Sequence, residues 1–145
     1  MSRCPGTEGS QGRAGVSDEA REEHRKAAKK AKSRGISTTG KCGYSRHVLL
    51  CIGKSCCEGG DHRDTARLLN KRLKKLERDG VYVYRTRVEC LNFCRSGPLL
   101  VVYPDGVWYH SVTTKVLNRI VDEHIVGGRA VAEYAFANNP MMDQR

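Results

Sequence analysis

The sequence predicts an α/β fold in which a four-stranded mixed sheet packs against two main helices, preceded by a flexible, basic N-terminal tail. Three observations lead to this fold class. A continuous apolar run of strand length covers residues 47–52, a stretch with apolar residues three and four apart covers 61–78, and an alternating segment covers 81–88. This order predicts a strand, a crossover helix and a second, parallel strand.

The first strand and the first helix have distinct local signals. The segment from His47 to Ile52 is apolar through its middle, which suits a strand that is buried on both faces. Asp61 can cap the following helix, which is expected to reach about Arg78 before Gly80 ends it. The apolar stripe of this helix consists of Ala66, Leu69, Leu73 and Leu76.

The second half of the domain predicts a hairpin and a last helix. Two short apolar segments, 99–103 and 107–110, flank Pro104-Asp105-Gly106, whose residue types favour a tight turn. A helix is then expected from Thr113 to about Val126, with apolar side chains on one face. The predicted order is therefore β-α-β-β-β-α.

The chain divides into a basic tail and one folded domain. It has 145 residues and a net charge of +10, a length that suits one modest core. Residues 1–45 are expected to be a largely disordered or partly helical tail, because 1–16 offer few apolar side chains to bury and Ser17 can cap a polar helix to Lys32. Residues 46–140 form the domain, and 141–145 are a C-terminal tail.

Four of the seven cysteines form two close pairs next to predicted strands. Cys51 and Cys56 are spaced C-x4-C after the first strand, and Cys90 and Cys94 are spaced C-x3-C after the second. Both pairs are expected to meet at one edge of the sheet, because parallel strands share a carboxyl end. Four thiolates suit a 2Fe-2S cluster, since soft sulfur completes the tetrahedral coordination of each iron. Cys57 is the alternative to Cys56.

These cysteine pairs, followed by Gly97-Pro98-Leu-Leu-Val-Val-Tyr-Pro-Asp-Gly-Val-Trp-Tyr109, resemble those of the thioredoxin-like 2Fe-2S ferredoxins. The same four-cysteine pattern occurs in the small, cluster-bearing subunit of NADH dehydrogenase complex I. The resemblance implies a thioredoxin-like sandwich over 46–140, the topology that periodicity also predicts. It further implies a one-electron carrier with one 2Fe-2S cluster per chain, bound by Cys51, Cys56, Cys90 and Cys94.

Other functions are weighed against this hypothesis. No nucleophile–base pair, phosphate-binding loop or carboxylate couple is apparent, so we expect an electron carrier without substrate turnover of its own. Three alternatives stay open: a thiol–disulfide redox protein, a Cys4 zinc-binding module, and an electron-transfer subunit of a larger NADH-linked complex. The Cys-x-x-Cys motif of thioredoxins is absent, which counts against the first alternative.

Charge and composition indicate the partners and the compartment. Lys54, Arg85, Arg87 and Arg95 fall within or beside the cysteine loops, which favours docking to an acidic reductase or acceptor. The resemblance is also compatible with a homodimer. Nucleic-acid binding is not expected, because no base-reading module accompanies the basic tail. The absence of an apolar leader or a long apolar run indicates a cytoplasmic protein without a membrane partner.

Overall fold

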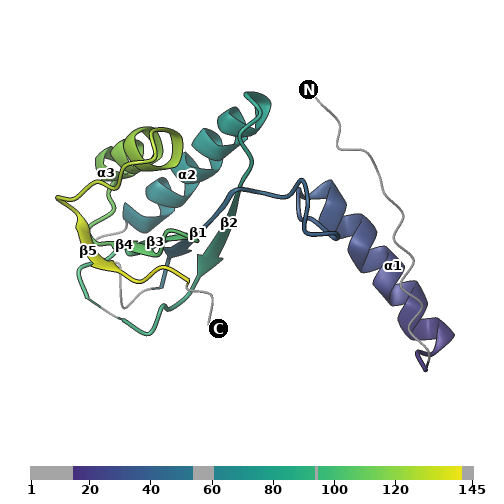
Figure 1. Ribbon diagram of the computed structural model, residues 1–145. Helices are drawn as coiled ribbons and strands as arrows, with labels where there is room; N and C mark the ends of the chain where they lie inside the picture. Colours follow the sequence, from purple (N-terminus) through teal and green to yellow (C-terminus); the bar gives the residue numbers. More distant parts are fainter. Residues whose placement is uncertain (1–14, 54–60, 94, 142–145) are drawn as a thin grey trace. The chain divides into compact units, whose positions relative to one another are not determined.

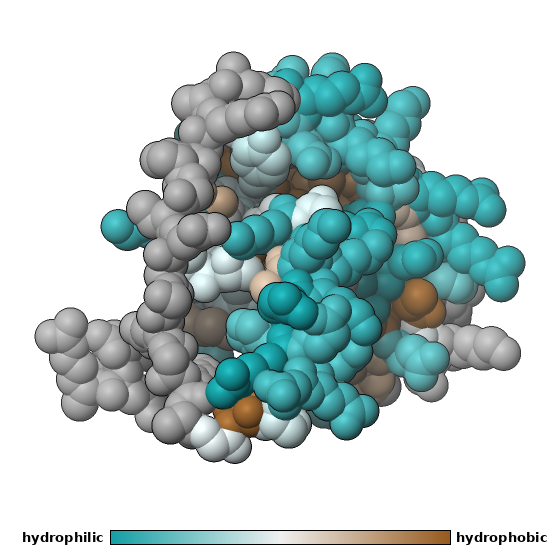
Figure 2. Space-filling view, turned by 90° about the vertical axis from the view of Figure 1, so that its right-hand side faces the viewer, coloured by the Kyte–Doolittle hydropathy of each residue, from teal (hydrophilic) through white to brown (hydrophobic). Residues whose placement is uncertain are grey.

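The computed structural model describes residues 15–53, 61–93 and 95–141. Contacts divide the chain into two units, 1–44 and 45–145, which are described separately. Hydrophilic side chains predominate on the face seen in Figure 2. Within the described ranges, no helix is both long enough and apolar enough to cross a membrane.

The first unit contains helix α1, Asp18–Ser33 (Figure 1). The Ser17 hydroxyl oxygen accepts a hydrogen bond from the Ala20 N–H at 3.3 Å, as expected of a helix cap. Acidic side chains occupy the first turn and lysines the last, the distribution that the helix dipole favours. No residue of α1 is buried, so the prediction of a polar, solvated helix is confirmed.

The second unit is built on a five-stranded mixed sheet. Its strands are β1 Arg46–Cys51, β2 Val83–Val88, β3 Leu100–Tyr103, β4 Val107–Tyr109 and β5 Ala135–Asn138, in the order β2-β1-β3-β4-β5. Strand β1 is parallel to β2, with Cys51 opposite Val88, and antiparallel to β3. The predicted pair of parallel strands and the predicted hairpin are both confirmed.

Strand β5 is an addition to the four strands expected from the sequence. It pairs antiparallel with β4 at the edge of the sheet, where Ala137 lies opposite Trp108 and Ala135 lies opposite Tyr109. The register shifts between Trp108 and Tyr109. Alanine and asparagine have low strand propensity, so the segment carries little local signal and forms a strand because the edge of β4 is available. Its end reaches the β3–β4 turn, where the Asn139 N–H donates to the Gly106 carbonyl oxygen at 2.7 Å.

Two helical segments cover one face of this sheet (Figure 1). Helix α2 spans Asp61–Arg78, in agreement with the prediction. The last helix is capped by the Thr113 hydroxyl and begins as α3, Thr114–Arg119. From Ile120 to Val126 it continues as the π-helix η1, where the sequence predicted a regular helix throughout.

The hydrophobic core lies between this face of the sheet and the helices. Alternate residues of the central strands, such as Val48, Leu50 and Val102, pack against the helices and are fully buried. Leu69 and Leu73 meet them from α2, and the last helix contributes Val116, Leu117, Ile120 and Val121. Each such side chain stabilises the fold by about 1.5–3 kcal/mol through burial. The rigid end of β1 therefore provides a fixed support for Cys51.

Candidate metal centre

Cys51 is the last residue of β1 and its side chain is fully buried. Its backbone N–H donates to the Leu99 carbonyl oxygen at 2.9 Å, and the next N–H, that of Ile52, donates to the Val88 oxygen at 2.8 Å. The strand end is thus bonded on both sides. The Cys51 Sγ lies 3.6 Å from the carbonyl oxygen of Glu89, at the end of the neighbouring parallel strand. One thiol is therefore held firmly at the carboxyl edge of the sheet.

Cys90 lies just beyond the end of β2 at the same edge, and it is exposed. Its Sγ accepts a hydrogen bond from the Asn92 N–H at 3.2 Å. Asn92 has a φ of 58°, a conformation that turns the loop back on itself and that asparagine tolerates better than most residues. Hydrogen bonds to sulfur stabilise the thiolate form that a metal ligand requires.

Gly53 brings the two cysteine loops into direct contact. A Cβ atom built on this glycine would lie 1.8 Å from the Glu89 carbonyl oxygen, far inside van der Waals contact. Only glycine therefore allows the chain leaving Cys51 to pass this close to the chain entering Cys90. This close approach places the chain leaving Cys51 directly beside the chain entering Cys90, so a group that binds sulfur from both loops would lie at this edge.

The structure brings two of the four predicted ligands, Cys51 and Cys90, to one edge of the sheet. Cys56 and Cys94, as well as the alternative Cys57, lie outside the described residues. The complete ligand set therefore stays a prediction. The segment leading from the second loop into β3 contains a cis peptide between Gly97 and Pro98, at the start of the buried strand.

Sequence comparison gives the family. No family profile matches the chain. A protein of Priestia megaterium assigned as a 2Fe-2S ferredoxin is 38% identical over 98 residues, covering 68% of this chain and 75% of that protein. The 2Fe-2S ferredoxin of Aquifex aeolicus is 31% identical over 97 residues, covering 59% and 84%. The chain belongs to the 2Fe-2S ferredoxin family. Members of this family are small electron carriers.

Solved structures identify the fold of this ferredoxin. The wild-type thioredoxin-like [2Fe-2S] ferredoxin of Aquifex aeolicus is 27% identical and superposes with a TM-score of 0.58, covering 65% of this chain and 98% of that one. Another structure of a thioredoxin-like [2Fe-2S] ferredoxin from this organism also gives a TM-score of 0.58, at 26% identity. The predicted thioredoxin-like fold class is confirmed. The sheet of this chain has five strands, one more than the sequence predicts.

An aromatic cluster lies on the second cysteine loop of the ferredoxin. Phe93 stacks on Phe136 of β5, with ring centroids 5.3 Å apart and an interplanar angle of 18°. Trp108 meets Phe136 edge-on at 6.5 Å. The sequence does not predict this contact, because it gives little local signal for β5. Strand β5 therefore supports the loop that carries Cys90, although Phe93 and Phe136 are 43 residues apart in the sequence.

Arg85 and Arg87 lie on β2, on the face that carries α2. The Arg85 guanidinium donates to the Asn70 side-chain oxygen of α2. Arg87 is opposite Leu50 in the parallel register, one residue before Cys51. The two arginines therefore lie near the cysteine edge on the helix face of the sheet, whereas the Cys51 side chain points to the opposite face. Arg95 is exposed just beyond the second loop. Lys54 lies outside the described residues.

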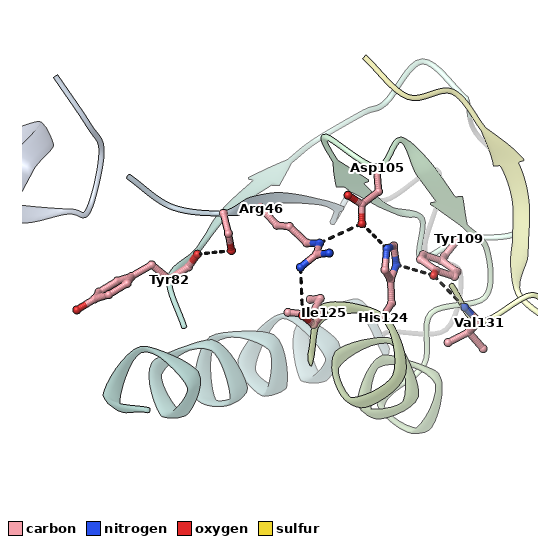
Figure 3. Close-up of polar contacts among 8 residues, drawn as sticks. Arg46, Tyr82, Asp105, Tyr109, His124, Ile125 and Val131 are labelled. Carbon is pink, nitrogen blue, oxygen red and sulfur yellow. Dashed lines mark hydrogen bonds and ion pairs between the residues drawn. The ribbon is translucent and has the colours of Figure 1, made fainter. Parts of the chain in front are cut away.

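A partly buried polar network lies at the opposite end of β1 (Figure 3). The Asp105 carboxylate accepts from Arg46 Nε at 3.0 Å and from His124 Nε2 at 2.6 Å. His124 Nδ1 lies 2.7 Å from the Tyr109 hydroxyl, which also accepts from the Val131 N–H at 3.1 Å. Every group is satisfied when Nε2 carries the imidazole proton and the Tyr109 hydroxyl donates to Nδ1.

Burial and ion pairing shift the pKa values in this network. Burial raises the pKa of Tyr109, so its hydroxyl stays protonated. Burial by itself also raises the pKa of Asp105, but the hydrogen bonds from Arg46 and His124, together with the positive charge of Arg46, outweigh it and hold that pKa below its ordinary value. The resulting stabilisation is present above the ordinary carboxyl pKa and is lost as the pH falls through the lowered one. The network is structural, because Arg46 lies about 16 Å from Cys51 along the strand.

Proposed function

We propose that residues 46–140 transfer one electron at a time through a 2Fe-2S cluster bound by Cys51, Cys56, Cys90 and Cys94. The observation that carries this proposal is the position of Cys51 and Cys90 at the ends of adjacent parallel strands, with Gly53 touching Glu89 between them. Family membership supports the cluster as the bound group. When bound, a cluster of this type accepts and releases a single electron.

The residues of the chain would hold this cluster by fixing sulfur positions and solvent access. Burial of Cys51 keeps water from one side, and its bonded backbone limits the movement of Sγ. The Asn92 N–H donates a hydrogen bond to the Cys90 sulfur, which stabilises negative charge on that sulfur. A site that changes little in geometry on gaining charge transfers electrons with little reorganisation. We propose a carrier without turnover of its own, because the ferredoxins that the chain resembles are electron carriers.

Visible absorption and metal content test the proposal against its alternatives. The purified protein is expected to be red-brown, to bleach on addition of dithionite, and to contain about two irons and two acid-labile sulfides per chain. A colourless protein with bound zinc would support the Cys4 zinc module instead. A metal-free protein whose thiols cycle with a disulfide would support the thiol–disulfide alternative. Stable co-purification with a flavoprotein would indicate a subunit of a larger NADH-linked complex.

Serine substitutions extend the same experiment to the individual ligands. Each of Cys51, Cys56, Cys90 and Cys94 changed to serine is expected to weaken or abolish the absorption, since a hydroxyl is a harder and weaker ligand for iron than a thiolate. Cys57→Ser is the matched control and should keep the spectrum. If Cys57→Ser loses the chromophore and Cys56→Ser keeps it, the ligand of the first loop is reassigned.

Arg85 and Arg87 are expected to raise the reduction potential. A cluster bound by four thiolates is anionic and gains a further negative charge on reduction, which nearby cations favour. Arg85→Gln combined with Arg87→Gln should therefore lower the midpoint potential in a spectroelectrochemical titration. Lys115→Gln combined with Arg129→Gln removes the same charge from exposed positions elsewhere in the domain and should change it less. Equal potentials in the two double variants would contradict this role.

The basic side chains near the cysteine edge also bear on the redox partner. We propose an acidic reductase or acceptor as redox partner, because basic side chains flank the cysteine edge. A homodimer and a cytoplasmic location are likewise proposals. Size-exclusion chromatography with light scattering measures the oligomeric state, and fractionation of cells identifies the compartment. Mixing with nucleic acid is not expected to alter the elution volume.

A further inference from the structure

A basic groove opens between α2 and β2, beside the cysteine edge. It has a volume of about 570 Å³. Ile52 and Ala66 give it an apolar floor, and Arg63 and Arg67 of α2 face Arg85 and Arg87 of β2 across it. None of the described residues that line it is a carboxylate. The groove therefore concentrates four guanidinium groups around a small apolar surface.

The arginines of the groove differ in how they are held. Arg85 is fixed by its bond to Asn70, which also lines the groove. Arg67 lies 3.6 Å from Asp64, but both side chains are more than two-thirds exposed, so this pair is weak. Arg63 and Arg87 have no ion pair with another described residue. Most of this positive charge is thus available to a ligand.

One residue that lines the groove, His62, has a buried ring nitrogen. This atom, Nδ1, has no hydrogen-bond partner among the described residues. It lies on the first turn of α2, next to Arg63.

The position of the groove links it to the proposed cluster. Ile52, in its floor, directly follows Cys51, and Arg87 lies three residues before Cys90. A molecule seated in the groove would lie at the same end of the parallel strands as both cysteines. Exposed basic side chains continue along α2 away from this end, including Lys71, Lys74 and Arg78. The charged surface is therefore longer than the groove itself.

We propose that the groove docks an acidic segment of the redox partner, with an apolar side chain on Ile52 and Ala66 and carboxylates on the arginines. This inference rests on the proposed electron-transfer function and identifies where the partner binds. Guanidinium groups pair with carboxylates through two parallel hydrogen bonds, and exposed pairs form and release quickly. An extended basic surface with an apolar floor fits a protein segment better than a small anion, which needs buried donors on all sides.

The test uses the oxidised holoprotein and a fluorescein-labelled peptide of alternating glutamate and leucine. Binding is measured by fluorescence anisotropy at low ionic strength. Arg67→Gln combined with Arg87→Gln, one residue from each wall, should weaken binding about tenfold, since each exposed ion pair contributes modestly. The matched control is Lys115→Gln with Arg129→Gln, which removes equal charge outside the groove and should weaken binding about twofold or less.

Other outcomes separate this inference from the proposed function. If the groove variant and the control weaken peptide binding equally while both retain the visible spectrum, the docking site is wrong and the electron carrier stands. If the unmodified protein has no chromophore, the proposed function fails first. Tighter binding of an oligothymidine of equal charge, lost in the groove variant, would overturn the inference in favour of nucleic acid. Displacement of the peptide by inorganic phosphate at constant ionic strength would overturn it in favour of a small-anion site.

Discussion

Gly53→Ala is expected to yield a protein that has lost most of its iron and visible colour. The new Cβ would lie 1.8 Å from the Glu89 carbonyl oxygen, whereas real Cβ atoms essentially never approach within 3.0 Å. The obstacle is backbone, so no side-chain rotation relieves it, and the two cysteine loops must move apart. Overpacking of this kind typically costs about 1–3 kcal/mol. Iron and sulfide content together with visible absorption measure the effect.

Gly80→Ala provides the control for this experiment. Gly80 has a φ of 86°, so alanine is strained there as well, but its Cβ would meet nothing within 4 Å. The control should lose about 1 kcal/mol of stability, because alanine is strained at a positive φ that glycine adopts freely. Its cluster content should stay close to that of the unmodified protein. A normal iron content in Gly53→Ala would show that the contact of the two loops is not needed for the cluster.

Tyr109→Phe is expected to cause the largest loss of stability without touching the cysteine edge. The change removes a fully buried hydroxyl and leaves the Val131 N–H and His124 Nδ1 without their partner. Each unsatisfied buried group costs about 1–3 kcal/mol. A drop in the thermal unfolding midpoint of several degrees is expected, measured by far-UV circular dichroism at one fixed scan rate.

Tyr82→Phe removes a hydroxyl from an exposed tyrosine and serves as the control. Tyr82 is 41% exposed, and the hydrogen bond drawn at this residue in Figure 3 is accepted by its backbone oxygen, which the substitution keeps. Its midpoint should change by less than about a degree, as for most surface changes. Should Tyr109→Phe and Tyr82→Phe unfold at the same temperature, the polar network would contribute nothing to stability.

The elements that carry their own periodic signal were predictable from the sequence. The apolar run before Cys51 and the leucine stripe of α2 each specify their structure locally, and both are confirmed. Their order then requires a parallel pair of strands, which brings Cys51 and Cys90 to one edge. This part of the candidate site follows from local pattern and chain topology alone.

The features that depend on distant partners were not predictable in this way. Strand β5 has a weak sequence signal and depends on the free edge of β4. The role of His124 follows from its contacts with Asp105 and Tyr109, which lie on the hairpin, and a helical wheel only places it on the buried face. The groove likewise needs two elements, since neither α2 nor β2 contains all four arginines.

Strand β1 has a different task at each of its ends. The polar network holds one end, at Arg46, and the proposed electron-carrying centre lies at the other, at Cys51. The intervening residues separate the two by about 16 Å, which exceeds the distance over which charges interact strongly in salt solution. Thermal stability and the reduction potential of the proposed cluster should therefore respond to different substitutions. Changes around Arg46 could raise the unfolding temperature without shifting that potential.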